Sequence, residues 1–432
     1  MALFDIENTK LRQNKKYKVL SLFSGCGGMD LGFEGGFIVH RQSVNETMHP
    51  DFIEEVLPDN YVRLRQTAFQ TVFSNDILGE ARKTWIRNFT KMGYDAANIC
   101  RGESVVDLVK QHKVFGNVFP TDIDVVTGGF PCQDFSVAGK RKGFMSDKGH
   151  NGKRIEGDVA SEETRGKLYF WMKEVIEITK PKIFIAENVK GLTNLGNVKD
   201  IIRNDFSSAG GNGYIVLTPK VLHAADYGVP QSRERVIFIG IRKDCLNEAA
   251  LSALQKDDVP EPFNPYPPIT HNYHIKDGVL TDFQTVKNVF QNLDEPENSN
   301  DLSQKLYSKA KYMGSHCQGQ SEVDLNSIGP TIRSEHHGNI EYRRLSAEHG
   351  GKHLEELSAG LKERRLTPRE CAMIQTFPPD FEFVFSKSEA CPFSVSPSGA
   401  YKVIGNAVPP LLAFNIADRI EKLWNLYFDK QL

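Results

Sequence analysis

Short apolar runs alternate with amphipathic stretches through the first half of this 432-residue chain. Strands are expected at 18–23, 69–76, 122–127, 182–187, 214–222 and 235–242, and helices at 77–89, 104–113 and 168–179. This alternation predicts an α/β fold, in which helices cover both faces of a parallel sheet. Because ligands bind such sheets at the carboxyl ends of the strands, the turns after Phe23, Asp76, Cys132 and Glu187 are candidate site positions.

The regular pattern breaks in the second half of the chain. From about Asn247 to Ser327 the sequence is rich in Pro, Asn and Asp and has weak periodicity, which predicts an irregular smaller domain or a long insertion. Regular elements resume near Leu366, where Thr367 and Pro368 predict a helix start as N-cap and first helical residue. A terminal helix is expected over 411–427.

The composition is that of an ordinary globular protein, with 40% hydrophobic and 25% charged residues. No apolar run approaches the ~20 residues needed to cross a bilayer, and the polar N-terminus lacks the apolar core of a signal peptide. The seven cysteines form no CxxC pair, which favours neither a zinc site nor a disulfide framework. We therefore expect a cytoplasmic protein without a membrane segment or a metal.

A thiol and a carboxylate each stand at the end of an apolar strand. The segment VVTGGFPC (125–132) leads to Cys132, with glycines that keep the approach open and Pro131 to stiffen the turn. This pattern indicates a nucleophile held up to a substrate. Glu187 ends the strand over 182–187, where apolar surroundings would raise its pKa and leave a neutral carboxyl able to donate a proton. A helix cap is the alternative for Glu187.

Two stretches concentrate positive charge, although the formal net charge is only −2. The first, 140–154, begins with Lys140, Arg141 and Lys142 and contains a single acid. Because it directly follows the candidate nucleophile, we expect a mobile loop that contacts phosphates. The second stretch, 362–369, has no such neighbour, and a solvated face is expected there.

A glycine-rich turn, FSGCGG (23–28), follows the first strand, and Asp76 ends the next one. Glycines allow a ligand to approach the backbone closely, and an acid at that place suits ribose hydroxyls, so the pair suits an adenosine-containing cofactor. A tight turn and a solvated aspartate are an equal alternative.

The segment QSRER (231–235) precedes the strand over 235–242. Strand alternation would place Arg233 and Arg235 on one face, where two guanidinium groups suit a phosphate, a base oxygen or a carboxylate. A structural ion pair is the alternative.

Together these motifs resemble the DNA (cytosine-5)-methyltransferase family of bacterial restriction-modification systems. Six stretches occur in the family's order, namely FSGCGG (23–28), PCQ (131–133), ENV (187–189), QSRER (231–235), RLTPRE (365–370) and GNAVP (405–409). A chance match to one is plausible, whereas a match to all six is not. The resemblance implies an S-adenosylmethionine-dependent, Rossmann-like fold with a doubly wound mixed sheet and a second, smaller, irregular target-recognition domain.

The resemblance also implies a reaction, in which S-adenosylmethionine gives a methyl group to C5 of a cytosine flipped out of double-stranded DNA. Cys132 would add to C6, Glu187 would protonate or hold N3, and Arg233 would hold O2, with Arg235 as a further catalytic residue. Cofactor contacts are implied for Phe23, Ser24, Gly25, Gly27, Gly28, Asp76, Ile77, Pro131, Asn406 and Ala407. DNA contacts are expected from Gln133, Ser136, Lys140, Arg141, Lys142 and Gln231.

We expect a catalytic domain over 1–242, completed by 395–432, and a target-recognition domain over 243–394. The family further implies a monomer associated with the bacterial nucleoid, with a cognate restriction endonuclease acting separately.

Three alternatives fit the sequence less well. A tRNA cytosine methyltransferase would lack the long recognition region. Retention of Cys132, Glu187 and Arg233 argues against a catalytically silent DNA-binding protein. A nicotinamide dehydrogenase would require GxGxxG.

Overall fold

The computed structural model describes residues 16–131, 168–194, 197–275, 277–309, 312–314, 320–334, 340–387 and 392–429. Its strands are β1 (Tyr17–Leu22), β2 (Ile38–His40), β3 (Ile53–Val56), β4 (Tyr61–Leu64), β5 (Phe69–Asn75), β6 (Cys100–Arg101), β7 (Val125–Gly128), β8 (Ile183–Val189), β9 (Tyr214–Val216), β10 (Lys220–His223), β11 (Glu234–Arg242), β12 (Ser321–Glu322), β13 (Glu341–Arg344) and β14 (Arg364–Arg365). Its α-helices are α2 (Gly28–Glu34), α3 (Gly79–Lys91), α4 (Ala96–Ile99), α5 (Val105–Phe115), α6 (Leu168–Thr179), α7 (Val198–Ser207), α8 (Glu248–Leu254), α9 (Val286–Phe290), α10 (Leu302–Lys305), α11 (Leu354–Ser358), α12 (Pro368–Ile374), α13 (Pro397–Asn406) and α14 (Pro410–Phe428). None of these helices is long and apolar enough to cross a membrane.

A mixed sheet forms the centre of the molecule, in the order β10-β11-β8-β7-β1-β5-β6, with β9 also paired to β11. The neighbours from β8 to β6 run parallel, whereas β11 is antiparallel to β8, β9 and β10. The predicted α/β class is confirmed, with antiparallel strands at one edge of a parallel centre. A separate three-stranded sheet, β2-β4-β3, occupies the segment between Phe37 and Phe69.

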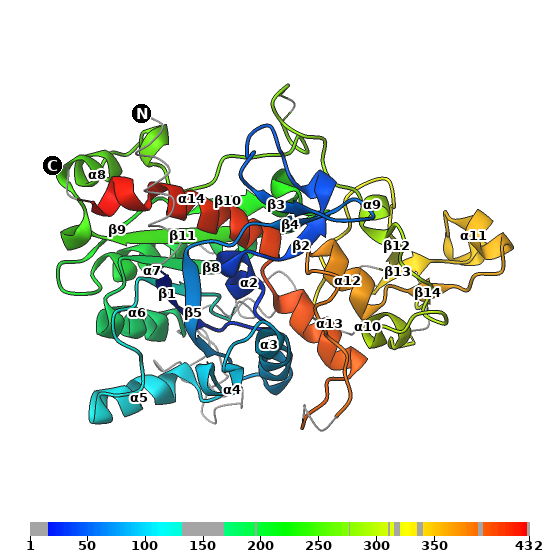
Figure 1. The fold of residues 1–432 in the computed structure, drawn as a ribbon, viewed down its shortest axis with the longest axis horizontal. Helices are drawn as coiled ribbons and strands as arrows, with labels where there is room; N and C mark the ends of the chain where they lie inside the picture. The colour runs from blue at the N-terminus through cyan, green and yellow to red at the C-terminus, as the bar shows by residue number, and fades with distance from the viewer. Residues whose placement is uncertain are drawn as a thin grey trace.

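Alternate residues of the central strands face two different cores, because side chains in a strand point to opposite faces. On one face, Val19, Val125 and Ile185 join a core with α2, α3 and α14. On the other face, Leu20 and Val126 join a core with α5, α6 and α7. Figure 1 shows α14 and α2 lying together on one side of the sheet, away from α5 and α6.

The predicted strand over 214–222 is interrupted. Both halves pair with β11, but they are separated by Leu217, Thr218 and Pro219. Pro219 has no backbone N–H to give to a ladder, so the pairing stops there and restarts at Lys220.

The irregular region after Asn247 contains the short helices α8, α9 and α10 separated by coil, as its weak periodicity predicted. The helix start at Thr367 is confirmed. Its side chain accepts from the backbone N–H of Glu370, the Glu370 carboxylate accepts from the N–H of Thr367, and Pro368 is the first helical residue. Figure 1 shows α11 and β12–β14 grouped at the opposite end of the molecule from α8.

The expectation that residues 362–369 form a solvated face holds for the exposed Lys362 but is wrong for the three arginines. Arg364, Arg365 and Arg369 are 5%, 8% and 3% exposed. Arg364 pairs with Glu370 at 2.8 Å, and the Arg365 guanidinium lies 3.9 Å from the centre of the Tyr401 ring. Carboxylates and an aromatic face inside the protein stabilise these charges, which no pattern of basic residues alone could show.

Candidate active site

Four parallel strands end side by side at one edge of the sheet. In the register of these strands, Leu22 lies opposite both Asn75 and Gly128, and Gly128 lies opposite Ala186. The residues that follow the ends of β1, β5 and β7, together with Glu187 of β8, therefore meet along this edge. This edge is where the sequence predicted ligand binding.

The turn after β1 is tied to the turn after β5. The backbone N–H of Gly25 donates to the Asp76 carboxylate at 2.9 Å, and the N–H of Leu78 donates to its other oxygen at 2.7 Å. Burial raises the pKa of Asp76, while these two N–H bonds oppose the rise. The backbone turns through positive φ at Phe23 (51°) and Gly25 (58°). The structure thus brings Phe23, Ser24, Gly25 and Asp76 together.

Open space lies beside this turn. A Cβ added to Gly25 would meet no atom within 4 Å, and the neighbouring Ile77 side chain is 49% exposed. A donor molecule with an adenosine moiety fits such a place, because an exposed apolar side chain can pack against a ring and a carboxylate can accept from hydroxyls. The chain's residues therefore fit the expected cofactor.

The C-terminal GNAVP motif packs against the same turn. A Cβ on Gly28 would collide with the carbonyl oxygen of Val408 and approach Ala407 Cβ to 3.4 Å. Gly27, at φ 92°, precedes Gly28 in the turn. Asn406 is exposed and is the last residue of α13. The absence of a side chain at Gly28 allows the two segments to touch.

Glu187 is paired with a guanidinium. Its Oε1 lies 2.6 Å from Arg235 Nε, and the two residues are 8% and 9% exposed. Arg235 belongs to β11, in which Ile237 is directly opposite Glu187. The sequence predicted partly apolar surroundings for this carboxylate but did not predict its ion pair with Arg235.

Arg233 and Arg235 are directed to different places. Arg233 is 0% exposed, and its guanidinium donates to the carbonyl oxygens of Ile332 at 3.1 Å and Gly405 at 2.9 Å. Arg233 thus joins segments far apart in the sequence, while Arg235 contacts Glu187. The expected shared site for both arginines is not formed.

Gln231 is also 0% exposed, and its side-chain oxygen accepts from the backbone N–H of Ile332 at 3.3 Å. This burial contradicts the expected DNA contact, because the side chain is held inside the protein by the segment that contains Ile332. Gln133, Ser136, Lys140, Arg141 and Lys142, like Cys132, lie outside the described residues.

Two residues at this edge were not identified from the sequence. The Asn188 side chain donates to the carbonyl oxygen of Phe130 at 3.0 Å, so it ties β8 to the segment that leads through Pro131. A Cβ on Gly129 would lie 2.8 Å from Glu187 Oε2. Both residues belong to motifs noted in the sequence, ENV and GGFPC. In those motifs, only Glu187 and Cys132 have side chains with an evident catalytic role.

Comparison with known proteins gives consistent matches. The family model for C-5 cytosine-specific DNA methylase matches residues 61–422. The Type II methyltransferase M.BsuRI of Bacillus subtilis is 31% identical over 428 residues, which cover 96% of this chain and 81% of the relative. The Type II methyltransferase M.NgoPII of Neisseria gonorrhoeae is 29% identical over 435 residues, which cover 96% of this chain and 99% of the relative.

Solved structures share the fold. The methyltransferase EhMeth of Entamoeba histolytica matches with a TM-score of 0.52 and 16% identity, over 96% of this chain and 99% of that one. The Dnmt2 methyltransferase of S. pombe also matches with a TM-score of 0.52 and 16% identity, over 95% of this chain and 99% of that one.

Proposed function

The chain belongs to the C-5 cytosine-specific DNA methylase family, and we propose that it methylates C5 of a cytosine within a specific sequence of double-stranded DNA. Its methyl donor is S-adenosylmethionine, which the family implies, and which supplies an electrophilic methyl group when bound. Phe23, Gly25, Asp76, Ile77 and the Asn406–Ala407 pair would hold the donor.

The Glu187–Arg235 pair carries the mechanistic part of the proposal. It lies at the carboxyl end of β8, beside the end of β7, from which the chain continues through Pro131 to Cys132. A buried acid and a guanidinium together can bind the N3 and O2 edge of a pyrimidine, where negative charge develops when a nucleophile adds to C6. We therefore assign the O2 contact to Arg235 in place of Arg233.

The steps follow from these positions. The Cys132 thiolate forms a bond to C6 of the extruded cytosine, and the C5–C6 double bond gives up its electron pair to the ring. Glu187 gives or shares a proton at N3, while Arg235 holds O2. The electron pair gained by the ring then bonds C5 to the methyl group, while the donor's methyl–sulfur bond breaks and the neutral thioether leaves. A base removes the C5 proton, the double bond re-forms, and the thiolate leaves.

The wider role follows from the relatives. M.BsuRI and M.NgoPII are named Type II methyltransferases, so we propose that this enzyme protects DNA beside a separately acting endonuclease. We assign sequence recognition to residues 243–394 and catalysis to 1–242 with 395–432, in a monomer.

One experiment tests substrate and reaction together. Bisulfite sequencing of a plasmid from a methylation-free host that expresses this chain should show a fully modified cytosine within one short sequence. The Cys132→Ser variant is the control and should leave the plasmid unmodified. Methylation of tRNA but not of duplex DNA in a parallel assay would overturn the DNA proposal. In the presence of S-adenosylmethionine, a duplex containing 5-fluorocytosine should form a denaturation-resistant adduct with the wild-type chain but not with Cys132→Ser, because fluorine at C5 blocks the final elimination.

A further inference from the structure

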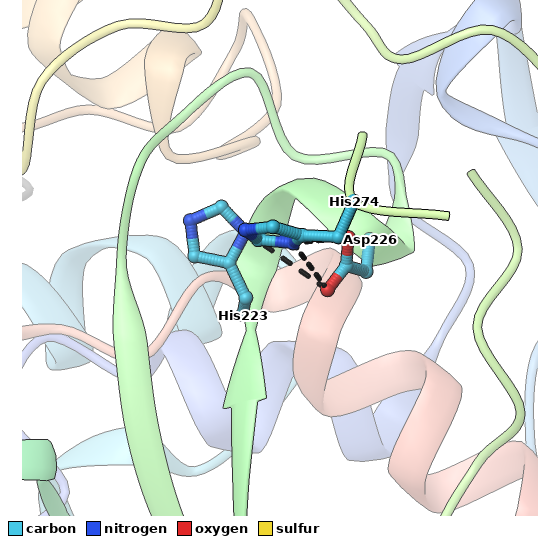
Figure 2. Close-up of side chains that lie close together, drawn as sticks. All are labelled: His223, Asp226 and His274. Carbon is cyan, nitrogen blue, oxygen red and sulfur yellow. Dashed lines mark hydrogen bonds and ion pairs between the residues drawn. The ribbon is translucent and has the colours of Figure 1, made fainter. Parts of the chain in front are cut away.

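Three potential metal ligands converge at the end of β10. His223 is the last residue of β10, Asp226 lies in the 3-10 turn η5 (Ala224–Tyr227), and His274 comes from the following coil. Figure 2 shows both imidazole rings directing a nitrogen towards the Asp226 carboxylate. Among the described residues, this is the one group of three such side chains close enough to share an ion, with all ligand atoms within 4.8 Å of one another.

One ring nitrogen of the group, His223 Nδ1, has no hydrogen-bond partner in the described structure. His274 Nδ1 lies 2.9 Å from Asp226 Oδ1, which is a hydrogen-bond distance. His223 Nδ1 is 4.0 Å from Asp226 Oδ2, too far for a hydrogen bond. The His223 side chain is only 9% exposed. A buried ring nitrogen without a partner costs free energy unless something binds it.

The backbone around the group is fixed. The Asp226 carbonyl oxygen accepts from the N–H groups of Thr270 at 2.9 Å and His271 at 3.0 Å. His271 itself is fully buried, and its Nε2 is 3.0 Å from the carbonyl oxygen of Gln42. Its side chain therefore has a structural role and is not one of the three ligands. His274, with a side chain 53% exposed, has room to change rotamer and close on an ion.

The electrostatics favour a cation. Asp226 supplies a negative charge. Opposite His223 in the sheet, Glu234 is engaged by Lys190 at 2.7 Å.

We propose that His223, Asp226 and His274 bind a zinc ion. Two imidazole nitrogens and one carboxylate oxygen form a donor set that Zn²⁺ accepts, with a water in the fourth position. At about 2.0 Å from each ligand, a tetrahedral ion requires the three atoms to draw together to about 3.3 Å from one another. His274 Nδ1 is already 2.9 Å from Asp226, so the closure needed at that carboxylate is the shortening of the 4.0 Å distance to His223 Nδ1.

Such an ion would cross-link the central sheet to the region after residue 243. Because β10 runs in the same direction as β8, through the antiparallel β11 between them, His223 lies at the same sheet edge as Glu187. His274 lies in the coil that a bridge between His271 and Thr281 closes. The ion would therefore fix that coil beside the active edge without touching the reacting atoms, and the proposal does not depend on the reaction.

Zinc titration of the chelator-treated protein tests the site. The wild-type chain should bind one Zn²⁺ and show a higher Tm with zinc than without it. His274→Ala should weaken binding about tenfold or more, and because this side chain is exposed, the variant should still fold. His349→Ala is the matched control, since His349 also pairs with a carboxylate, Glu363 at 2.8 Å, but has no third ligand in the described structure. It should bind zinc like the wild type.

Two results would overturn the proposal. One is the absence of zinc binding and of any Tm change. The other is equal zinc affinity in the wild type and His274→Ala, which would assign the ion elsewhere. A cobalt(II) derivative would show whether the ion is bound by cysteines instead. Thiolate ligands add an intense near-ultraviolet absorption band that a site of two histidines and one carboxylate lacks.

Discussion

Glu187 and Arg235 touch at 2.6 Å although they come from adjacent strands that run in opposite directions. The antiparallel direction of β11 is what makes the contact possible. It places the first residues of β11 beside the carboxyl end of β8. A parallel strand would place its last residues there. The reversed strand at the sheet edge thus has a chemical consequence, because it delivers a cation to the catalytic edge.

Replacing Arg235 by Lys should lower kcat by about 10²-fold or more. Lysine keeps the positive charge but loses the planar fork that can hold a carboxylate and a base oxygen together. Transfer of a radiolabelled methyl group to duplex DNA measures the effect. Glu234→Gln is the control, since that side chain is 39% exposed and pairs with Lys190. Wild-type turnover in Arg235→Lys would remove this residue from the mechanism.

Gly129→Ala should reduce turnover while leaving donor binding intact. The added Cβ would lie 2.8 Å from Glu187 Oε2, so the carboxylate has to move, and a small displacement of a catalytic group can cost about 10²-fold. Gly79→Ala is the matched change, because a Cβ there meets nothing within 4 Å. A parallel loss in both variants would show that the contact with Glu187 is not the cause.

Gly28→Ala should destabilise the protein by about 1–3 kcal/mol and weaken donor binding. The new methyl group would press on the Val408 carbonyl and on Ala407, which forces the two segments apart. Urea unfolding and calorimetric titration with S-adenosylmethionine measure the two effects. Unchanged stability would mean that the contact between this turn and the GNAVP motif is loose.

Stability should depend on Glu295 in acid. Burial alone raises the pKa of this carboxyl, but the Arg344 and Arg364 guanidinium groups donate to it and hold its pKa at about 2, below the ordinary 4.5. A depressed folded-state pKa contributes stability that is present above about pH 4.5 and lost as the pH falls towards 2. With a quarter of the side chain exposed (24%), solvent screening limits this contribution to about 2 kcal/mol.

The comparison with Glu295→Gln isolates that contribution. The difference in urea midpoint between the wild type and this variant should be largest near neutral pH and should narrow as the pH falls below 4.5. A difference that stays constant down to pH 3 would contradict the assigned pKa.

Local sequence patterns predicted the central sheet well, because each strand or helix is defined by its own periodicity. Leu168–Thr179 forms the helix expected from its pattern. The strands β1, β5 and β7 end within one residue of the predicted positions, whereas β8 continues two residues beyond Glu187 to Val189. The strand predicted over 214–222 is wrong at Pro219, because proline has no N–H for the ladder and interrupts the pairing with β11.

The site could be predicted only in part, because alternation along a strand does not define a side chain's partner. Arg233 and Arg235 were expected to act together, yet one is held by the carbonyl oxygens of Ile332 and Gly405 and the other by Glu187. These partners come from distant segments. The same reason explains part of the burial of Arg364, which pairs with Glu370 six residues away and also with Glu295, which is 69 residues away in the sequence.

The packing of α14 along α2 makes the first segments of the chain depend on the last ones. Cys26 contacts the carbonyl oxygen of Val403, 377 residues later. During synthesis on the ribosome, the nascent chain therefore has to wait for its final helix to emerge before this core can close. Methylation is therefore expected only after α14 has emerged, and fragments that lack α14 are expected to be substrates for proteases.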